Sequence, residues 1–487
     1  MLQSEVYERA RLARDARFDG QFFIGVRTTG IYCRPICPVN APKRENVTFF
    51  PSAAAASEAG YRPCLRCRPE CAPGTPAWSG TSTTVRRGLR LIAGGALDGG
   101  NVEELAERLG VTSRHLRRLF TKHLGASPLA VAHTQRLHFA KRLIDDTNLP
   151  MIHISAAAGF GSVRRFNDVF MKTYGRSPRE LRKFAGARHR AGESAALELR
   201  LPYRMPFDWR TMLSFFAQRA TPGVESVSGQ MYRRTISVDG EHGIVQVGPG
   251  TRPGGLSLTL HGVRTNALFE VIQRMRELFD LDAPVGEIGT ALARDKSLRR
   301  FLQKHPGVRV PGAWDGFELT VRAILGQQVS VKAATTLAGR IAARYGERLG
   351  VAGADPALAR VFPPAERLRR ARFNDSGLVR SRAETIRRVA GAVTAGELKF
   401  DPSQDPEEFC TALCSIRGVG DWTAQYVAMR VLKYPDAFPA TDLGLLKALL
   451  HPERTTPGVM RQRAEAWRPW RAYAAILMWS SLAGSGG

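Results

Sequence analysis

The sequence predicts a multidomain protein that is mainly α with α+β parts, and three observations lead to this prediction. The chain has 487 residues, which exceeds one ordinary domain. Two close pairs of cysteines occur near the amino terminus. Apolar and polar residues alternate as in strands between about 197 and 282, and they follow helical spacing from 284 onward. We therefore expect a small four-cysteine domain over residues 1–75, an all-α double helix-turn-helix domain over 82–185, a small α+β domain over 197–282, and an all-α domain over 283–487, with linkers at about 72–84 and 184–196.

Composition restricts the partner and the compartment. Lys and Arg number 71 against 44 Asp and Glu, which gives a net charge of +27. A basic surface on folded domains indicates a polyanion, most simply DNA or RNA, and the motifs described below favour double-stranded DNA. No apolar run reaches the roughly 18 residues of a membrane span, and the charged start MLQSEVYERARLARD lacks the apolar core of a signal peptide. We expect a cytoplasmic DNA-binding protein without membrane contact, and we expect it to be a monomer.

The cysteines of the first domain have the spacing of a metal site. Five of the seven cysteines lie within the first 71 residues. Two close pairs on separate loops can close a tetrahedral Zn²⁺ site with four thiolate ligands. The spacing therefore predicts one zinc ion on Cys33, Cys37, Cys64 and Cys67, with Cys71 outside the site. Spacing alone leaves open a purely structural zinc that staples a small domain.

The residues around these cysteines suggest a chemical role. DGQFFIGVRTTGIYCRPICP, followed by RENVTFF and AGYRPCLRCRP, resembles the N-terminal domain of the Ada methylphosphotriester repair proteins over most of residues 15–70. The resemblance implies that Cys33 accepts a methyl group from DNA. Four thiolates on Zn²⁺ carry a formal charge of about −2, so one methylation would reduce repulsion from DNA phosphates. It thus implies a sensor that binds DNA more tightly once methylated. The basic residues near the site suit a phosphate partner; they are Arg34, Lys43, Arg44, Arg66 and Arg68.

The second domain contains two helix-turn-helix units. VEELAERLGVTSRHLRRLFTKHLGASP is the first and MIHISAAAGFGSVRRFNDVFMKTYGRSPRELR the second, joined by a helix from about His133 to Asp145. We expect Ser113 to cap the first recognition helix and Ser162 to begin the second. The expected DNA-contacting residues are Arg114, His115, Arg117, Arg118, Arg164, Arg165 and Asn167. Paired units with Gly-Phe-Gly-Ser in the second turn resemble the AraC/XylS transcription-factor domain, which implies promoter DNA and RNA polymerase as partners; basic helices that simply pack together are the alternative.

The remaining chain changes from strands to helices. LELRLPYRM, MYRRTISVDG, HGIVQVGPG and GLSLTLHG alternate as strands, with helices expected near Trp209–Ala220 and Asn266–Phe279. After Pro284 the segment FELTVRAILGQQVSVKAATTLAGRIAARYGE predicts an amphipathic helix pair. These patterns favour a small α+β domain followed by an all-α domain.

A glycine hairpin and a single acid form the most distinctive stretch, SIRGVGDWTAQYVAMRVLKYPDAFPATD. Gly418 and Gly420 open a helix that carries Trp422 and Tyr426, and Asp442 ends the stretch. Glycines let another molecule approach the backbone, and amides at a helix start face an anion. We expect the hairpin to bind a DNA phosphate, although a plain turn between two packed helices has the same sequence signature.

Five segments place this stretch in a family. PFDWRTMLSFFAQRATPGVESV, FDLDAP, VRAILGQQVSV, the hairpin and WRPWRAYAAILMWS resemble, in order, the AlkA-type 3-methyladenine DNA glycosylases of the helix-hairpin-helix superfamily, over about 290 residues. The resemblance implies that Asp442 is the catalytic carboxylate. It places the base pocket at Phe215, Trp422, Tyr426 and Trp479, the wedge into the DNA stack at Gln328 beside Gln327, and a monovalent cation on the carbonyls of Cys414, Ile416 and Val419.

This sequence departs from the AlkA family at two positions that matter for the site. Gln328 stands where the family has a Leu wedge, and Leu443 stands where AlkA has Tyr. Trp422 takes the position of the Schiff-base lysine found in bifunctional relatives such as endonuclease III. A tryptophan at that position predicts that the protein releases the base without cutting the strand.

The chemistry expected of these residues is consistent. The target base must leave the stack before its glycosidic bond can be reached. An alkylated purine is cationic, so aromatic faces attract it, and a carboxylate stabilises the oxocarbenium character that develops on the sugar. We therefore predict a DNA alkylation-damage response protein: a glycosylase acting through Asp442, with a zinc-bound Cys33 that methylates itself to regulate transcription. Two alternatives stay open: a regulator with an inactive glycosylase half, and a glycosylase with a structural zinc. The residue types leave open whether Asp442 acts as a base or as an electrostatic stabiliser.

Overall fold

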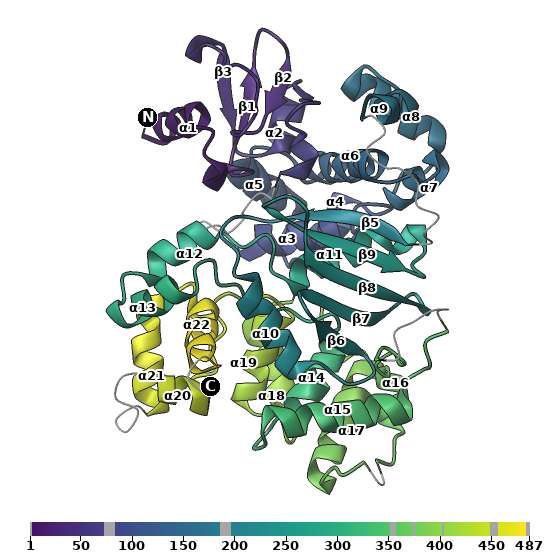
Figure 1. Cartoon of the computed structure of the whole chain (residues 1–487), viewed down its shortest axis with the longest axis vertical. Coiled ribbons are helices and arrows are strands. Elements are labelled where there is room, and N and C mark those ends of the chain that lie inside the picture. Colours follow the sequence, from purple (N-terminus) through teal and green to yellow (C-terminus); the bar gives the residue numbers. More distant parts are fainter. Residues whose placement is uncertain are drawn as a thin grey trace.

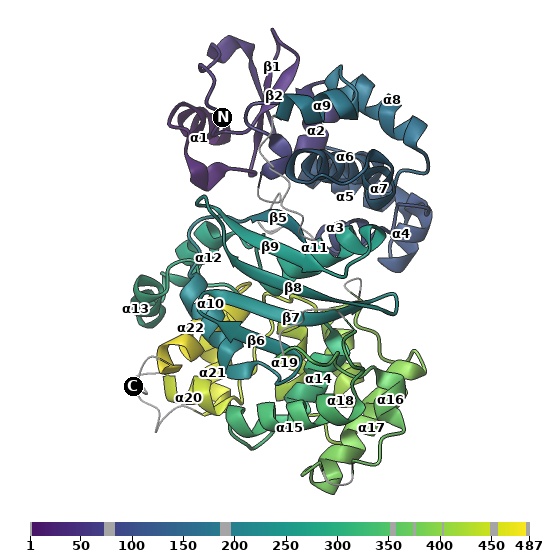
Figure 2. The same ribbon diagram turned by 45° about the vertical axis from the view of Figure 1, so that its right-hand side comes forward.

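The computed structural model describes residues 2–72, 83–185, 196–350, 357–373, 376–401, 404–448 and 456–483. The two expected linkers lie mainly outside these ranges. The amino-terminal part sits at one end of the long axis, a five-stranded sheet lies in the middle, and a helical part forms the other end (Figures 1 and 2).

The amino-terminal part is a small sheet with two helices. A four-stranded sheet has the order β3-β1-β2-β4, in which β1 pairs antiparallel with β2 and β3, and β4 runs parallel to β2. Ile24 on β1 lies opposite Cys33, which ends β2. The sheet therefore fixes the backbone of the predicted methyl acceptor. The elements are α1 (Leu2–Leu12), β1 (Phe23–Val26), β2 (Ile31–Cys33), β3 (Val47–Phe50), α2 (Ala53–Glu58) and β4 (Arg62–Pro63).

The second part has both predicted helix-turn-helix units. They are α4–α5 and α7–α8, with α6 between them. The prediction that Ser113 caps the first recognition helix is wrong, because Ser113 is already helical and Thr112, with an extended backbone, accepts a 3.3 Å hydrogen bond from the His115 amide. The second recognition helix begins at Val163, close to the predicted start at about Ser162, and Ser162 is its cap. The elements are α3 (Thr83–Ala93), α4 (Val102–Arg108), α5 (Ser113–Leu124), α6 (Pro128–Asp146), α7 (Met151–Ala157), α8 (Val163–Tyr174) and α9 (Pro178–Ala185).

The middle sheet is antiparallel, with the order β5-β9-β8-β7-β6. The four predicted strands are present. The sequence analysis missed β6, because ESVS is short and lacks a clear apolar alternation. Its buried Glu225 pairs with Arg322 at 2.8 Å, so a charge rather than an apolar side chain anchors this strand. The elements are β5 (Leu197–Pro202), α10 (Trp209–Arg219), β6 (Glu225–Ser228), β7 (Met231–Val238), β8 (Glu241–Pro249), β9 (Gly255–His261) and α11 (Leu268–Leu278).

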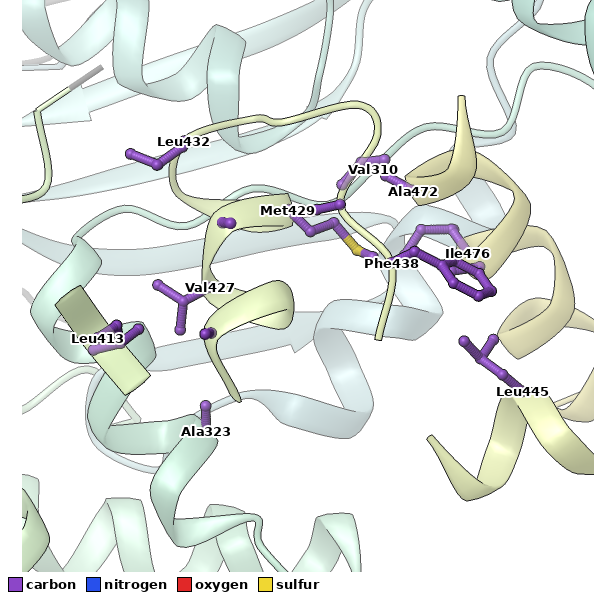
Figure 3. Close-up of a cluster of buried hydrophobic side chains, with 14 of the residues drawn as sticks. Val310, Ala323, Leu413, Val427, Met429, Leu432, Phe438, Leu445, Ala472 and Ile476 are labelled. Atoms are coloured by element: carbon purple, nitrogen blue, oxygen red, sulfur yellow. The ribbon is translucent and has the colours of Figure 1, made fainter. Parts of the chain in front are cut away.

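The carboxy-terminal part is helical, and α19 lies at its centre. Figure 3 shows Val427 and Met429 of α19 among side chains from α14, α18 and α22. Burial of this face fixes the direction of the other face, which carries Trp422 and Tyr426. The helices are α12 (Val285–Leu292), α13 (Lys296–Lys304), α14 (Gly316–Leu325), α15 (Val331–Tyr345), α16 (Ala365–Arg369), α17 (Arg380–Thr394), α18 (Pro406–Cys414), α19 (Asp421–Arg430), α20 (Leu443–Ala448), α21 (Pro457–Ala464) and α22 (Arg471–Ala483).

Helix α6 joins neighbouring parts of the molecule. Its side chains share one buried core with the middle sheet, and Phe139 meets Phe269 edge-on with ring centroids 4.7 Å apart. On the amino-terminal side, the Tyr32 hydroxyl and His138 Nε2 are hydrogen-bonded at 2.9 Å. The two expected DNA-handling halves are therefore in direct contact. Of the helices in the described ranges, none is long and apolar enough to span a membrane.

Candidate functional site

Three N–H groups hold the Asp442 carboxylate at the start of α20. Trp422 Nε1 donates to Oδ2 at 2.8 Å, and Trp479 Nε1 donates to Oδ1 at 2.8 Å. The Leu445 amide donates to Oδ1 at 2.9 Å. These donors come from α19, α22 and α20, so three helices fix one half-buried acid. The sequence analysis placed both tryptophans near this acid but did not foresee that their indole N–H groups bind it.

The predicted pocket aromatics gather beside this acid. Trp422 and Tyr426 are one helical turn apart on α19 and stack, with ring centroids at 5.1 Å and an interplanar angle of 9°. The ring of Trp479 lies 6.1 Å from that of Tyr426, tilted by 60°. Phe215 reaches the group from α10, in the domain of the middle sheet. The structure thus brings together four aromatic residues that are up to 264 positions apart, from 215 to 479.

Arg430, which no sequence pattern singled out, connects these aromatics. Its guanidinium carbon lies 5.0 Å from the Phe215 ring centroid and 5.2 Å from that of Tyr426. Nη1 donates to the Tyr426 hydroxyl at 2.5 Å. Burial alone would raise the pKa of Tyr426, but the charges of Arg430, Arg219 and Arg322 leave this pKa below its ordinary value. The sequence contained one signal for this role, a single arginine one helical turn after Tyr426 on a helix with a buried face.

The hairpin glycines have different roles. Gly418 has a φ of +99°, and a Cβ there would lie 2.0 Å from Thr385 Oγ1, so this position requires glycine. A Cβ on Gly420 would meet nothing within 4 Å, and this residue is exposed, so the hairpin surface at Gly420 is open. The Val419 amide donates to the Ile416 carbonyl at 2.9 Å. Because Ile416 is one of the predicted cation ligands, the turn already occupies one lone pair of that carbonyl oxygen.

The two glutamines of the predicted wedge also differ. Gln327 Nε2 donates to the Gly418 carbonyl and to Thr423 Oγ1, both at 3.1 Å, so this side chain braces the hairpin. Gln328 is exposed, with a φ of +56° at the turn between α14 and α15. Of the two, only Gln328 presents an exposed side chain at the turn.

The four predicted zinc ligands are buried together. The sulfur atoms of Cys33, Cys37, Cys64 and Cys67 all lie within 4.8 Å of one another, and this is the one such group of metal-binding side chains in the described ranges. A cluster of four buried thiols fits tetrahedral Zn²⁺. Cys71 is outside the group, as expected.

Two nearby arginines are not available to DNA phosphate. Arg34 binds Asp19 and donates to the Cys67 carbonyl at 3.0 Å. Arg68 lies 2.9 Å from Asp145 and 3.0 Å from Asp146, both at the end of α6. The expectation that they face phosphate is therefore wrong; buried or half-buried carboxylates neutralise them first.

The recognition helices present the predicted side chains to solvent. All are exposed except His115, which is half-buried. Arg117 pairs with Glu103 at 2.9 Å, and Arg118 Nη2 lies 3.0 Å from His115 Nδ1. On α8, Arg164, Arg165 and Asn167 share one exposed face. Both helices thus offer basic or amide groups that could reach DNA.

Four family models match successive parts of the chain. They are the metal binding domain of Ada at residues 7–70, a helix-turn-helix domain at 105–183, the AlkA N-terminal domain at 198–315, and the HhH-GPD superfamily base excision DNA repair protein at 321–472. A Mycobacterium tuberculosis protein, the probable bifunctional transcriptional activator/DNA repair enzyme AlkA, is 42% identical over 480 residues, which cover 97% of this chain and 95% of the relative. The chain belongs to this family. The predicted combination of a glycosylase with a transcription regulator in an alkylation response is thereby confirmed.

Relatives of each half support the same arrangement of this AlkA-type fusion. The Escherichia coli DNA-3-methyladenine glycosylase 2 is 36% identical over 282 residues, which cover 57% of this chain and 95% of the relative. The Escherichia coli Ada protein, a bifunctional transcriptional activator/DNA repair enzyme, is 40% identical over 119 residues, which cover 24% of this chain and 32% of the relative. The solved 3-methyladenine DNA-glycosylase of Archaeoglobus fulgidus has a TM-score of 0.52 at 24% identity, over 57% of this chain and 96% of that one, which shows a shared fold.

Proposed function

We propose that this protein hydrolyses the glycosidic bond of alkylated purines of the 3-methyladenine type, with Asp442 as the catalytic residue. The observation that carries the proposal is the carboxylate held by three donors beside an aromatic cluster. A carboxylate oxygen accepts about two hydrogen bonds. Oδ1 already accepts two, whereas Oδ2 accepts one from Trp422. Oδ2 therefore keeps acceptor capacity for the reacting sugar or the attacking water.

The reaction follows from these contacts. The C1′–N bond breaks, its electron pair leaves with the cationic base, and the departing base becomes neutral. Oδ2 stabilises the positive charge that develops on the sugar, and water adds at C1′ and releases one proton, to Asp442 or to bulk water. Because Trp422 stands where a Schiff-base lysine would act, the protein leaves an abasic site and an intact strand. A further cation at the hairpin would sit on the carbonyls of Cys414, Ile416 and Val419.

The test measures release of 3-methyladenine from methylated duplex DNA in a single turnover. We expect Asp442→Asn to slow release by about 100- to 1,000-fold, the usual effect of removing a group that stabilises transition-state charge. Asp405→Asn, which changes the cap of α18, is the matched control and should be near wild type. Equal rates for Asp442→Asn and wild type would reject the mechanism. Strand breaks that appear before alkali treatment would show lyase activity and contradict the proposal that the strand stays intact.

We also propose that Cys33 accepts a methyl group from a DNA methylphosphotriester. Its sulfur attacks the methyl carbon, the carbon–oxygen bond breaks, and the phosphate regains its negative charge. Zinc on the four cysteines would keep the thiolates deprotonated at neutral pH. Mass spectrometry after exposure to such DNA should show one added methyl group on the Cys33 peptide of wild type and Cys71→Ser, and none on Cys33→Ser. An unmodified Cys33 in the wild type would leave the zinc site purely structural.

The methylated protein would then bind promoter DNA through α5 and α8 and act with RNA polymerase as a monomer. Exposed basic groups on both recognition helices support the DNA contact. Footprinting with Arg164→Ala and Arg117→Ala tests it: both variants should lose protection of the promoter. Protection equal to wild type would place the DNA contact elsewhere.

A further inference from the structure

We propose that Arg90, on the first helix of the helix-turn-helix half, is a positioning residue of the glycosylase site. The inference rests on the proposed function of Asp442 and extends it, because it assigns part of the base-releasing site to the regulatory half of the chain. Arg90 fixes the segment that follows α19, and α19 carries Trp422, Tyr426 and Arg430.

Arg90 joins three parts of the protein. It lies on α3, with its side chain only 14% exposed. Nε donates to Glu277 Oε1 at 3.1 Å, near the end of α11. Nη1 donates to the Leu432 carbonyl, two residues after α19 ends. One guanidinium therefore ties the end of α19 to the domain of the middle sheet.

The segment that Arg90 holds has a strained backbone. Lys433 has a φ of +52°, a left-handed backbone conformation that residues other than glycine rarely adopt. Its Nζ donates to the Val310 carbonyl at 2.7 Å and lies 3.4 Å from Asp280. A cavity of about 310 Å³ lies on this side, lined by Arg90, Glu277 and Lys433 among others. Polar bonds, and not close packing alone, therefore keep this turn in place. Such a conformation persists only while its surroundings hold it.

From this turn, a continuous series of contacts leads to the catalytic carboxylate. Arg430, the last residue of α19, donates to the Pro311 carbonyl at 2.9 Å and the Gly312 carbonyl at 2.7 Å. It also donates to the Tyr426 hydroxyl, and the Tyr426 ring stacks on Trp422. Trp422 in turn binds Asp442 Oδ2. A small shift of a reacting group has a large effect on rate, so loss of Arg90 should slow the reaction.

A second contact between the halves provides the matched control. Arg108 on α4 pairs with Asp401 at 3.0 Å, with side chains 45% and 29% exposed. Asp401 precedes α18, the helix before the hairpin. Both arginines therefore bridge the halves, but Arg108 binds ahead of α18, whereas Arg90 binds the segment that directly follows the helix of the catalytic aromatics.

The experiment uses the full chain and a methylated duplex without a promoter sequence. Single-turnover release of 3-methyladenine and DNA affinity by fluorescence anisotropy are measured for Arg90→Met and Arg108→Met. We expect Arg90→Met to slow release by about 2- to 30-fold, the range for residues that modulate a distant site, while affinity stays within about twofold. Arg108→Met should match wild type in both. Unchanged release by Arg90→Met, or equal slowing by Arg108→Met, would overturn the proposal.

Two further variants test the route. Arg90→Lys keeps a cation near Glu277 and should recover part of the rate. Tyr426→Phe already removes the hydrogen bond from Arg430 to the Tyr426 hydroxyl. Adding Arg90→Met to this variant should therefore change the release rate little. Fully additive effects of the two substitutions on the rate would reject this route. Asp442→Asn separates the two proposals. If it equals wild type, the catalytic assignment fails; if it is inactive while Arg90→Met and Arg90→Lys match wild type, only the role of Arg90 fails.

Discussion

The indole N–H of Trp479 donates a 2.8 Å hydrogen bond to Oδ1 of Asp442 and so joins α22 to α20. Gly444 leaves the space for this bond. A Cβ at that position would lie 2.9 Å from Asp442 Oδ1 and 3.4 Å from Trp479 Nε1. The position of the Asp442 carboxylate therefore depends on the lack of a side chain at Gly444 as well as on the three hydrogen-bond donors.

Replacing Gly444 with Ala should slow base release without weakening the fold. A hydrogen bond to a charged group contributes about 1.5–3 kcal/mol, so its loss corresponds to about 10- to 100-fold in single-turnover rate. Alanine favours helix over glycine, so the melting temperature should not fall. Gly286→Ala on α12, where a Cβ would meet nothing within 4 Å, is the control and should keep the wild-type rate. An unchanged rate for Gly444→Ala would show that the bond to Trp479 survives.

The hairpin glycines should respond differently to alanine. Gly418→Ala forces a side chain into a left-handed backbone and against Thr385, so we expect a clear fall in melting temperature. Gly420→Ala has open space and a φ of −107°, so its melting temperature should stay close to wild type while DNA affinity falls. Thermal unfolding and anisotropy measure the two effects. Equal destabilisation by both variants would contradict the assignment of Gly420 to the DNA side.

Stability should fall in acid because His138 is half-buried and neutral in the folded protein. Burial, with Arg142 and Lys141 nearby, lowers the pKa of His138 to about 4. The unfolded chain takes up this proton near its ordinary pKa of about 6.5. The contribution of neutral His138 is thus complete above that pH and decreases as the pH falls towards 4, by up to about 3 kcal/mol. His138→Gln should flatten the dependence of unfolding free energy on pH between these values. If His138→Gln shows the same slope of unfolding free energy against pH as the wild type, His138 is not the group responsible.

The contact between Phe139 and Phe269 should couple the stability of the two halves. Their rings belong to α6 and to the first turn of α11, within one shared core. A double-mutant cycle with both residues changed to Ala should give a coupling energy of about 1 kcal/mol in denaturant unfolding. Phe184→Ala, whose side chain is 56% exposed on α9, should change stability by less than about 0.5 kcal/mol. Additive effects of Phe139→Ala and Phe269→Ala would show that the halves unfold independently.

Local patterns in the sequence predicted much of this architecture. The spacing of Cys33, Cys37, Cys64 and Cys67 indicated the metal cluster, and helical periodicity indicated both helix-turn-helix units. Local patterns failed where two candidates were adjacent or the signal was weak. Thr112 and Ser113 are both good caps, and only the backbone conformation at Thr112 separates them. The strand β6 has too few residues for a reliable alternation.

The sequence by itself determined which residue types this protein can use: thiolates for a metal, basic helices for DNA, and one acid among aromatic residues. The tertiary structure decided which atoms meet. It turned the N–H groups of Trp422 and Trp479 to Asp442, bound Gln327 to the hairpin, and placed Arg90 against the end of α19. These contacts join residues that are 20 to 342 positions apart. Packing of several helices at once sets such contacts, and no local periodicity or spacing encodes them.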